Sequence, residues 1–501
     1  MGSSVKAVSN TVFLTLDWIS TTLISFAYSF VIWKTLSPAD YGIITTSINL
    51  MMILGGIGLL GMGTAVQKLI AEYLVKNKRG NIGQLIRMSF ITFLIIDLAV
   101  SAILLSNRSF FASALKINEN VIWLICIGIF IFSFYSISSN ILYGFQNMKG
   151  YFKTDVTGNL LKFIVSTLLI LLGFSYFGPL IGFLICFTVI PLLRLRPSWF
   201  HSATGVDKKY IMMEYSLPAF VFILATLVFN YSHYIILTVI KNPEVTGLFS
   251  LAMVIASLVS LIPTIITQAI FPIMSQLSVK KNSKMKQVKL INAALRYSLL
   301  FAIPFSIALT IMLKPLILFL KIKTEYLPAV QYLPIASLGW IFIGCASIFS
   351  NNLYAIGKTK INRNIAILTT VLFLATSIPM TYYFSAYGLV SAFLAVGIVQ
   401  FFTSYHYMKK FLNFKLPLAD VGKILFSSVI FILLLYFGEK YLASFVLKVM
   451  LVFIAAIIYG AVLSRLLKFF NGQDIFIIRS VSSNLPKPIR NITDRLIEKF
   501  L

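Results

Sequence analysis

Long runs of apolar residues recur along the whole chain, separated by Pro, Gly, Asn and clusters of charge. A helix needs about 20 apolar residues to cross the ~30 Å hydrocarbon core of a bilayer, and many of the runs are of that order. Only 11% of the residues are charged, against roughly 25% in soluble domains. We therefore expect an all-α membrane protein with about 14 transmembrane helices. Its spans are expected at 12–33, 41–66, 88–106, 120–145, 157–176, 178–195, 212–240, 246–272, 292–313, 329–356, 364–384, 386–408, 421–438 and 443–464.

Segments of the first half recur in the second half in the same order. Residues 36–42, with the letters LSPADYG, resemble residues 241–247, KNPEVTG, at an offset of 205 (38 to 243). Three further pairs, at offsets of 204 to 211, keep this order: 65–76 with 269–280, 142–149 with 353–360 and 174–180 with 384–390. The four pairs indicate an internal duplication, so the chain is two related halves followed by a remainder. In a membrane protein this organisation is typical of transporters.

Lysine and arginine are distributed unequally between the two predicted sides of the membrane. The N-terminus, the connections after even-numbered spans and the tail hold 33 of the 42 Lys and Arg residues. Because cytoplasmic loops are enriched in these residues, we expect a multi-pass protein of the cell membrane with both termini in the cytoplasm. Topology and contact with anionic membrane lipids then account for most of the net charge of +27, and a nucleic-acid partner is disfavoured.

Several motifs carry a resemblance to a known family. Residues 36–42 precede a Gly-rich segment, 55–63, and further motifs are KLIAEY at 68–73, EYSLP at 214–218 and LYAIGKTK at 353–360. With these motifs, residues 5–465 resemble the polysaccharide-export (Wzx-like) branch of the multidrug/oligosaccharidyl-lipid/polysaccharide (MOP) flippase superfamily. The resemblance implies two pseudo-symmetric six-helix bundles plus two C-terminal helices. It also implies transport of a polyprenyl-(di)phosphate-linked saccharide from the cytoplasmic to the outer leaflet.

Combined with the repeat, the resemblance predicts the domain boundaries. We expect an N-terminal bundle at 1–205, a second bundle at 206–415, two additional helices at 416–465 and a cytoplasmic tail at 466–501. Apolar residues from 489 to 501 recur at helical spacing opposite charged ones, which predicts an amphipathic helix lying in the membrane interface.

The first predicted span contains a carboxylate, Asp17, although an ionisable group in a span costs ~2.5–3.5 kcal/mol near a helix centre on insertion scales. Thr21 and Ser25 follow at intervals of four and share its helix face. We predict that Asp17, with Thr21 and Ser25, binds a coupling proton or cation or accepts sugar hydroxyls. The alternative is a carboxylate that stabilises helix packing alone. Some relatives that move a large anionic lipid carry arginines within this span, so the phosphate contact is left unassigned.

Three further polar residues inside spans are candidates for substrate or ion binding. Asp97 lies in the third predicted span between Ile95-Ile96 and Leu98-Ala99-Val100, where a cavity role and a structural hydrogen bond are both open. Asn230 and His233 lie on one face of the seventh span, and a histidine can titrate near neutral pH. A histidine packed within the helix interface is the alternative for His233.

Cations near span ends are candidates for the diphosphate, because Arg grips two phosphate oxygens and Lys supplies a point charge. These candidates are Lys34, Lys68, Lys162, Arg296 and Arg363. Each could equally be an ordinary anchor at the cytoplasmic face. No Walker loop, paired-carboxylate motif, metal-spaced His/Cys set or nucleophile elbow occurs, so we expect a transporter without catalytic residues, cofactor or metal.

Two other functions are compatible with parts of the sequence. One is an ion-coupled exporter of small cationic or amphipathic compounds, as in the drug-extruding branch of the same superfamily. The other is a membrane glycosyltransferase or polymerase, which the short predicted outer loops disfavour. Glycosyltransferases of the same pathway are possible partners of a flippase.

Overall fold

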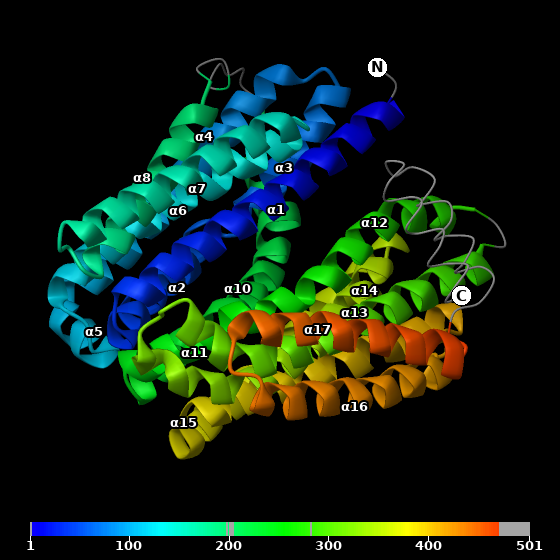
Figure 1. Ribbon diagram of the computed structural model, residues 1–501. Helices are drawn as coiled ribbons and strands as arrows, with labels where there is room; N and C mark the ends of the chain where they lie inside the picture. The colour runs from blue at the N-terminus through cyan, green and yellow to red at the C-terminus, as the bar shows by residue number, and fades with distance from the viewer. Residues whose placement is uncertain (1–2, 197–198, 200–204, 281–282, 470–501) are drawn as a thin grey trace. The chain divides into compact units, whose positions relative to one another are not determined.

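All regular secondary structure in the described part of the chain is helical (Figure 1). The computed structural model describes residues 3–196, 199, 205–280 and 283–469. The helices of eight or more residues are α1 (Ser3–Thr35), α2 (Pro38–Gly58), α3 (Met62–Val75), α4 (Arg79–Ser106), α5 (Arg108–Leu115), α6 (Glu119–Gly144), α7 (Met148–Leu171), α8 (Phe177–Arg194), α10 (Leu217–Ile240), α11 (Pro243–Ser257), α12 (Leu261–Ser278), α13 (Lys284–Phe319), η4 (Thr324–Tyr332), α14 (Leu333–Ala355), α15 (Thr359–Leu412), α16 (Leu418–Tyr441) and α17 (Phe445–Ala461). Short turns, α9 (Lys208–Ile211), η2 (Met212–Ser216), η3 (Leu258–Ser260) and η5 (Val462–Leu466), extend their neighbours.

Within the described residues, 13 helical segments are long and apolar enough to cross a membrane. One of them, α15, has 54 residues, which at 1.5 Å per residue would reach ~80 Å and far exceed a bilayer. Its backbone leaves the helical conformation at Ser385 (φ 56, ψ −140). A side chain on Gly388 would overlap the Met380 carbonyl, so the chain folds back on itself there. The predicted turn between spans 364–384 and 386–408 is therefore present, and with α15 divided there the 13 segments correspond to the expected 14 spans.

The first repeated motif begins two equivalent helices. Ser37 caps α2 with a capping box, in which its hydroxyl accepts from the Asp40 amide and the Asp40 carboxylate accepts from the Ser37 amide. Asn242, 205 residues later, accepts from the Val245 amide at the start of α11. Pro follows each cap, where its missing N–H costs no helical hydrogen bond. The pattern that the two motifs share, a capping residue followed by Pro and, four residues after the Pro, by Gly, therefore marks the start of a helix.

The glycines of this motif bring the two helix starts together. A Cβ on Gly42 would overlap the Pro243 carbonyl, and a Cβ on Gly247 would overlap the Pro38 carbonyl. Glycine is required at both positions because the backbones touch. The contact is reciprocal, as expected for two repeats meeting across a pseudo-two-fold axis.

The second predicted span, 41–66, was expected to be continuous, and that expectation is wrong. The helix stops at Gly58, and Leu60 (φ 45) and Gly61 (φ 77) adopt left-handed backbone conformations before α3 starts. Glycine at position 61 permits the close approach of the Ser216 carbonyl from the segment preceding α10. The Ser216 hydroxyl donates to the Leu60 carbonyl at 2.5 Å and so satisfies a backbone acceptor that the break exposes.

Three pairs of left-handed residues recur at the offsets of the sequence repeat. They are Lys116 and Lys321 (offset 205), Gln146 and Gly357 (offset 211), and Ser175 and Ser385 (offset 210). Positive φ is unusual outside glycine, so its recurrence in matched turns supports the two pseudo-symmetric halves.

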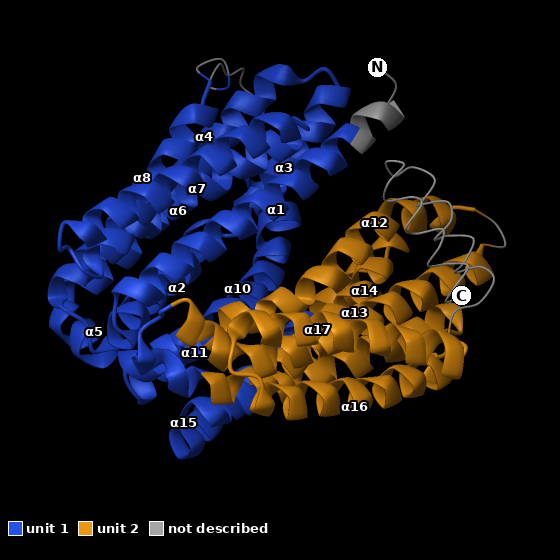
Figure 2. Cartoon of the chain, viewed as in Figure 1, with its two compact units in different colours: residues 1–251, 321–329, 366–392 blue, residues 252–320, 330–365, 393–501 orange. Residues whose placement is uncertain are grey.

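Two compact units are distinguished by their internal contacts (Figure 2). Unit 1 comprises residues 1–251, 321–329 and 366–392; unit 2 comprises residues 252–320, 330–365 and 393–501. Unit 1 includes α10 because it packs against α2. This division follows contacts alone, so the domain boundaries at 205, 415 and 465 stay a prediction. The amphipathic helix predicted at 489–501 lies outside the described residues.

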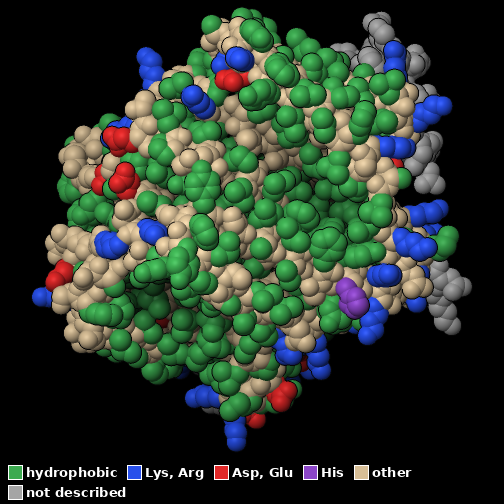
Figure 3. Space-filling model, turned by 90° about the horizontal axis from the view of Figure 1, so that it is seen from below, with side chains coloured by type: hydrophobic (Ala, Val, Ile, Leu, Met, Phe, Trp, Pro, Cys, Tyr) green, Lys and Arg blue, Asp and Glu red, His purple; other side chains and the backbone are tan. Residues whose placement is uncertain are grey.

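The two C-terminal helices pack inside unit 2 on α13. Leu300 of α13, Phe431 of α16 and Tyr459 of α17 belong to one buried apolar cluster, and the Tyr459 hydroxyl donates to the Leu300 carbonyl at 3.0 Å. The opposite side of these helices exposes large apolar residues, including Phe426 and Phe453. Apolar side chains cover much of the surface drawn in Figure 3, as expected for a protein whose solvent is lipid.

Candidate functional site

Asp17 lies in the middle of α1, on the side that packs against α7. Its side chain is buried, and its Oδ1 has no hydrogen-bond partner among the described residues. The Thr21 hydroxyl donates to the Asp17 backbone carbonyl at 2.8 Å rather than to the carboxylate. Ser25 is half-buried one turn further on. The structure therefore places the predicted triplet on one helix and leaves Asp17 Oδ1 without a partner in the described part of the chain.

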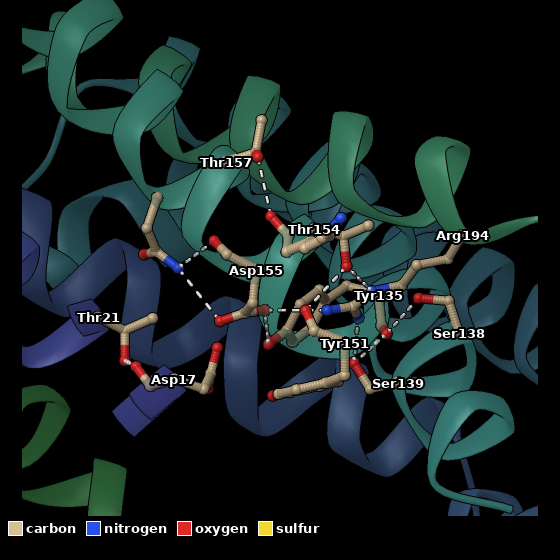
Figure 4. A network of polar contacts seen from close by, with 12 residues as sticks. Asp17, Thr21, Tyr135, Ser138, Ser139, Tyr151, Thr154, Asp155, Thr157 and Arg194 are labelled. Carbon is tan, nitrogen blue, oxygen red and sulfur yellow. Dashed lines mark hydrogen bonds and ion pairs between the residues drawn. The ribbon is translucent and has the colours of Figure 1, made fainter. Parts of the chain in front are cut away.

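A buried ion pair faces Asp17 from the neighbouring helices. Arg194, at the end of α8, lies 3.1 Å from Oδ1 of Asp155 on α7, and both side chains are almost fully buried. Arg194 also donates to the Thr154 hydroxyl (2.8 Å) and the Ser139 hydroxyl (2.6 Å). Three nitrogens of the guanidinium thus donate to residues of α6 and α7, which fixes the planar group in a single orientation (Figure 4).

Aromatic and amide groups complete this network. The Tyr135 hydroxyl donates to Asp155 Oδ1 at 3.0 Å, and the Asn159 amide lies 3.3 Å from the other oxygen. The Arg194 guanidinium lies over the rings of Tyr135 and Tyr151, at 5.2 and 4.7 Å from their centroids. Cation–π attraction adds to the ion pair in a desolvated setting.

Asp17 and Asp155 point toward one another in Figure 4. Both Asp155 and Arg194 are near enough to act on Asp17 electrostatically. Two carboxylates thus converge on one guanidinium, and the direct ion pair belongs to Asp155. An uncompensated charge inside a membrane protein is costly, so Asp17 is the member at which a proton or a cation would be stabilising.

Of the other polar candidates, Asp97 is fully buried in α4 with no hydrogen-bond partner for either oxygen in the described structure. Asn230 of α10 is exposed. His233 is buried, with its ring 4.1 Å from Tyr234, 5.6 Å from Phe249 and 6.4 Å from Phe373 between ring centroids. The Asp17 network, defined as Asp17 with Tyr135, Asp155, Asn159 and Arg194, is built from α1, α6, α7 and α8, whereas Asn230 and His233 lie on α10.

One of the five phosphate candidates reaches that network. Lys162 of α7 donates to the Asn159 side chain at 3.0 Å and lies over the Tyr28 ring at 5.0 Å. The other four lie elsewhere: Lys34 is exposed beside Phe30, Lys68 lies over the Tyr215 ring at 4.5 Å, Arg296 pairs with Asp420 at 2.8 Å and donates to the Phe469 carbonyl, and Arg363 is half-buried in α15. Their contact with a phosphate stays a prediction.

Residues 7–278, more than half of the chain, match the model of a family described as "Polysaccharide biosynthesis protein". The chain belongs to this family. Among curated proteins no match was found.

Among solved structures, the fold of this chain is similar to "Lipid II flippase MurJ, inward closed conformation" (TM-score 0.73, 18% identity), over 91% of this chain and 99% of that chain. It is also similar to an inward-facing multidrug resistance MATE family transporter of the MOP superfamily (TM-score 0.63, 15% identity), over 81% of this chain and 99% of that chain. The predicted MOP superfamily fold, with twelve helices plus two, is confirmed.

Sequence reasoning missed Asp155 and Arg194 in this family member. The fifth span was expected to start at 157, and α7 starts at Met148, so Asp155 lies two turns inside the helix. Arg194 lies at the end of the predicted span 178–195 and is one of the 33 charges assigned to the cytoplasmic side, although it is 3% exposed at the end of α8. The signal that could have found them is the Asp155–Asn159 spacing of four, which places an acid and an amide on one helix face.

Proposed function

We propose that this protein is a flippase that moves a polyprenyl-(di)phosphate-linked saccharide across the cytoplasmic membrane by alternating access, for polysaccharide or glycoprotein biosynthesis. The observation that carries the proposal is the extent of the structural match to a lipid II flippase, together with membership of the polysaccharide biosynthesis family. That match covers 91% of the chain, against 81% for the MATE transporter. The difference, about 50 of 501 residues, is close to the length of the segment from α16 to η5, 418–466.

The Asp17 network supports a transporter driven by an ion gradient. Asp17 binds the coupling proton or cation, and Asp155 with Arg194 holds the helices that surround it. The saccharide passes along polar side chains while the polyprenyl tail stays in lipid. The excess of Lys and Arg on one side supports an orientation with both termini in the cytoplasm, where glycosyltransferases of the same pathway would deliver the substrate.

Flipping in proteoliposomes tests the proposal. A fluorescent polyprenyl-diphosphate saccharide is placed in both leaflets, and its accessibility to a membrane-impermeant quencher is followed with and without an imposed proton or sodium gradient. Protein-dependent loss of protection is expected, with a rate that responds to one gradient. Asp17→Asn keeps the size of the side chain and removes its charge, so it should abolish that response.

Asp207→Asn is the matched control for this charge change. Asp207 is exposed, and its side chain accepts from the Tyr210 amide at 2.9 Å, a capping role that Asn also fills. The control should flip like the wild type. Full gradient dependence in Asp17→Asn would refute the coupling role while leaving the flippase proposal intact.

The similarity to MATE transporters favours one second candidate, an ion-coupled exporter of small cationic or amphipathic compounds. Gradient-driven uptake of a cationic dye, without flipping of the saccharide lipid in the same vesicles, would establish it and exclude the flippase.

A further inference from the structure

Asp97 is a second buried carboxyl group, separate from the Asp17 network, that has no partner in the described structure. It lies in the interior of α4, its side chain has 0% exposure, and neither oxygen has a hydrogen-bond partner among the described residues. Ser101, one turn further along α4, is also buried with an unpartnered hydroxyl. Most buried polar groups in native proteins are paired, so these two residues require a physical account.

The Asp97 carboxyl packs against the point at which α2 ends. A Cβ on Gly58 would overlap Asp97 Oδ1, so this oxygen touches the Gly58 backbone directly. The next residues, Leu59 to Gly61, form the break before α3. Ser133 of α6 is fully buried beside the same segment, where its hydroxyl donates to the Gly55 carbonyl at 3.0 Å. The carboxyl is thus enclosed by α2, α4 and α6.

A metal ion does not suit this enclosure. A sodium or calcium ion needs several oxygens arranged around it, and here Oδ1 faces the Cα of Gly58. The Gly55 carbonyl already accepts from the Leu59 amide as well as from Ser133. The contacts at Oδ1 therefore favour a proton on the carboxyl over a coordinated cation.

A charged partner for Asp97 is also missing from the neighbouring elements in the described structure. The helices packed on α4 are α2, α3, α5 and α6. Their titratable groups are Asp40, Tyr41, Lys68, Glu72, Tyr73, Arg108, Glu119, Cys126, Tyr135 and Tyr143. Cys126 lies beside the next turn of α4, with its Sγ 3.9 Å from the Ser101 carbonyl, and the Asp97 environment otherwise includes the Ser133 hydroxyl. An ionised Asp97 would stand uncompensated in this setting.

We propose that Asp97 is a proton-binding site, occupied in this conformation, which releases its proton only when the broken α2–α3 segment moves away from α4. Closed packing against Gly58 excludes water and stabilises the neutral acid. Movement at the break, where Leu60 and Gly61 already have non-helical conformations, admits water and permits ionisation. Proton release is thereby tied to a change in one helix pair. The inference does not depend on the transported substrate.

Infrared spectroscopy of the purified full-length protein in lipid tests occupancy directly, because a protonated carboxyl and a carboxylate absorb in different regions. At neutral pH the wild type should show a carboxylic-acid band that Asp97→Asn lacks. Asp97→Glu should retain an acid band at a shifted frequency, and it decides the question if Asp97→Asn does not fold. The control Asp207→Asn should leave the band unchanged.

Identical spectra of the wild type and Asp97→Asn, or no shift in Asp97→Glu, would overturn the proposal. Gly58→Ala tests the coupling to the break, because its Cβ pushes α2 away from Asp97. The pH dependence of the acid band should then differ from that of the wild type, and an unchanged titration would refute the coupling. Neither result requires flipping, so failure of the proposed flippase function would be seen separately.

Discussion

The reciprocal contact of the two repeats predicts a disulfide that should form readily. Thr45 and Ser250 are 205 residues apart, the offset of the repeated motif, and their hydroxyl oxygens lie 3.1 Å from each other. With ordinary C–O bond lengths this separation puts the Cβ atoms roughly 4 to 5 Å apart, near the upper end of the ~3.5–4.5 Å found in disulfides. The Gly42 and Gly247 contacts hold both backbones, so little movement is needed.

We expect the pair Thr45→Cys/Ser250→Cys to cross-link in most molecules on mild oxidation. The three native cysteines are buried and would be replaced by Ala to give a clean background. If the repeats separate here during alternating access, the oxidised protein should lose flipping and a reductant should restore it. Mobility on denaturing gels before and after a protease cut between α2 and α11 measures the yield.

A matched pair sets the geometric limit of this experiment. Asn49 lies one turn beyond Thr45 on α2, ~6 Å further along the helix. The pair Asn49→Cys/Ser250→Cys should therefore cross-link much less. Equal yields for the two pairs would refute the packing described for the helix starts. Complete cross-linking with undiminished flipping would show that this contact persists through transport.

Substitutions at three further places, the Asp155–Arg194 pair, Gly42 and Ser385, test the packing. Asp155→Asn removes the direct counter-charge of the buried Arg194 and should lower the free energy of unfolding in detergent by about 3–5 kcal/mol, whereas adding Arg194→Leu should recover part of the loss. No loss in the single variant would show that the pair contributes nothing. Gly42→Ala should cost about 1–3 kcal/mol by overpacking, seen as a lower midpoint of chemical unfolding. Ser385→Gly should melt at or above the wild-type temperature and Ser385→Val below it, since the left-handed backbone at the α15 hairpin costs roughly 1–3 kcal/mol outside glycine; the reverse order would contradict that conformation.

Much of the fold could be predicted because the membrane permits few backbone conformations. A run of about 20 apolar residues can satisfy its backbone in a membrane only as a helix or in a closed barrel, so run length and interruptions were sufficient to place the spans. The break after Gly58 was not predictable in this way. Gly55 to Gly63 is apolar throughout, and the left-handed turn depends on Ser216, which is remote in sequence.

The candidate site was predictable in part. Asp17 is conspicuous because a lone acid within an apolar run must be compensated by something in the fold. Asp155 and Arg194 are near span ends, where charged residues are common and cost little free energy, so their burial could not be inferred from position alone. The Thr21 hydroxyl was predicted to take part in binding with Asp17. It donates a hydrogen bond to the backbone of its own helix instead, as Ser and Thr often do within helices. Side-chain partners across helices depend on packing, which the pattern of one helix does not contain.

The charges of the Asp17 network suggest which residues act in coupling and which in folding. Arg194 contacts Asp155, and Lys162 donates to the Asn159 amide, so neither cation forms a direct pair with Asp17 among the described contacts. Under the proposed coupling role, a proton or cation would therefore bind to Asp17 and leave it without breaking the buried pair. Removal of either partner of that pair should first lower stability, whereas Asp17→Asn should change the response to a gradient while leaving stability near that of the wild type. Unfolding and flipping, measured on the same Asp17→Asn and Asp155→Asn preparations, separate the two roles. A large loss of stability in Asp17→Asn would show that Asp17 serves helix packing and not coupling.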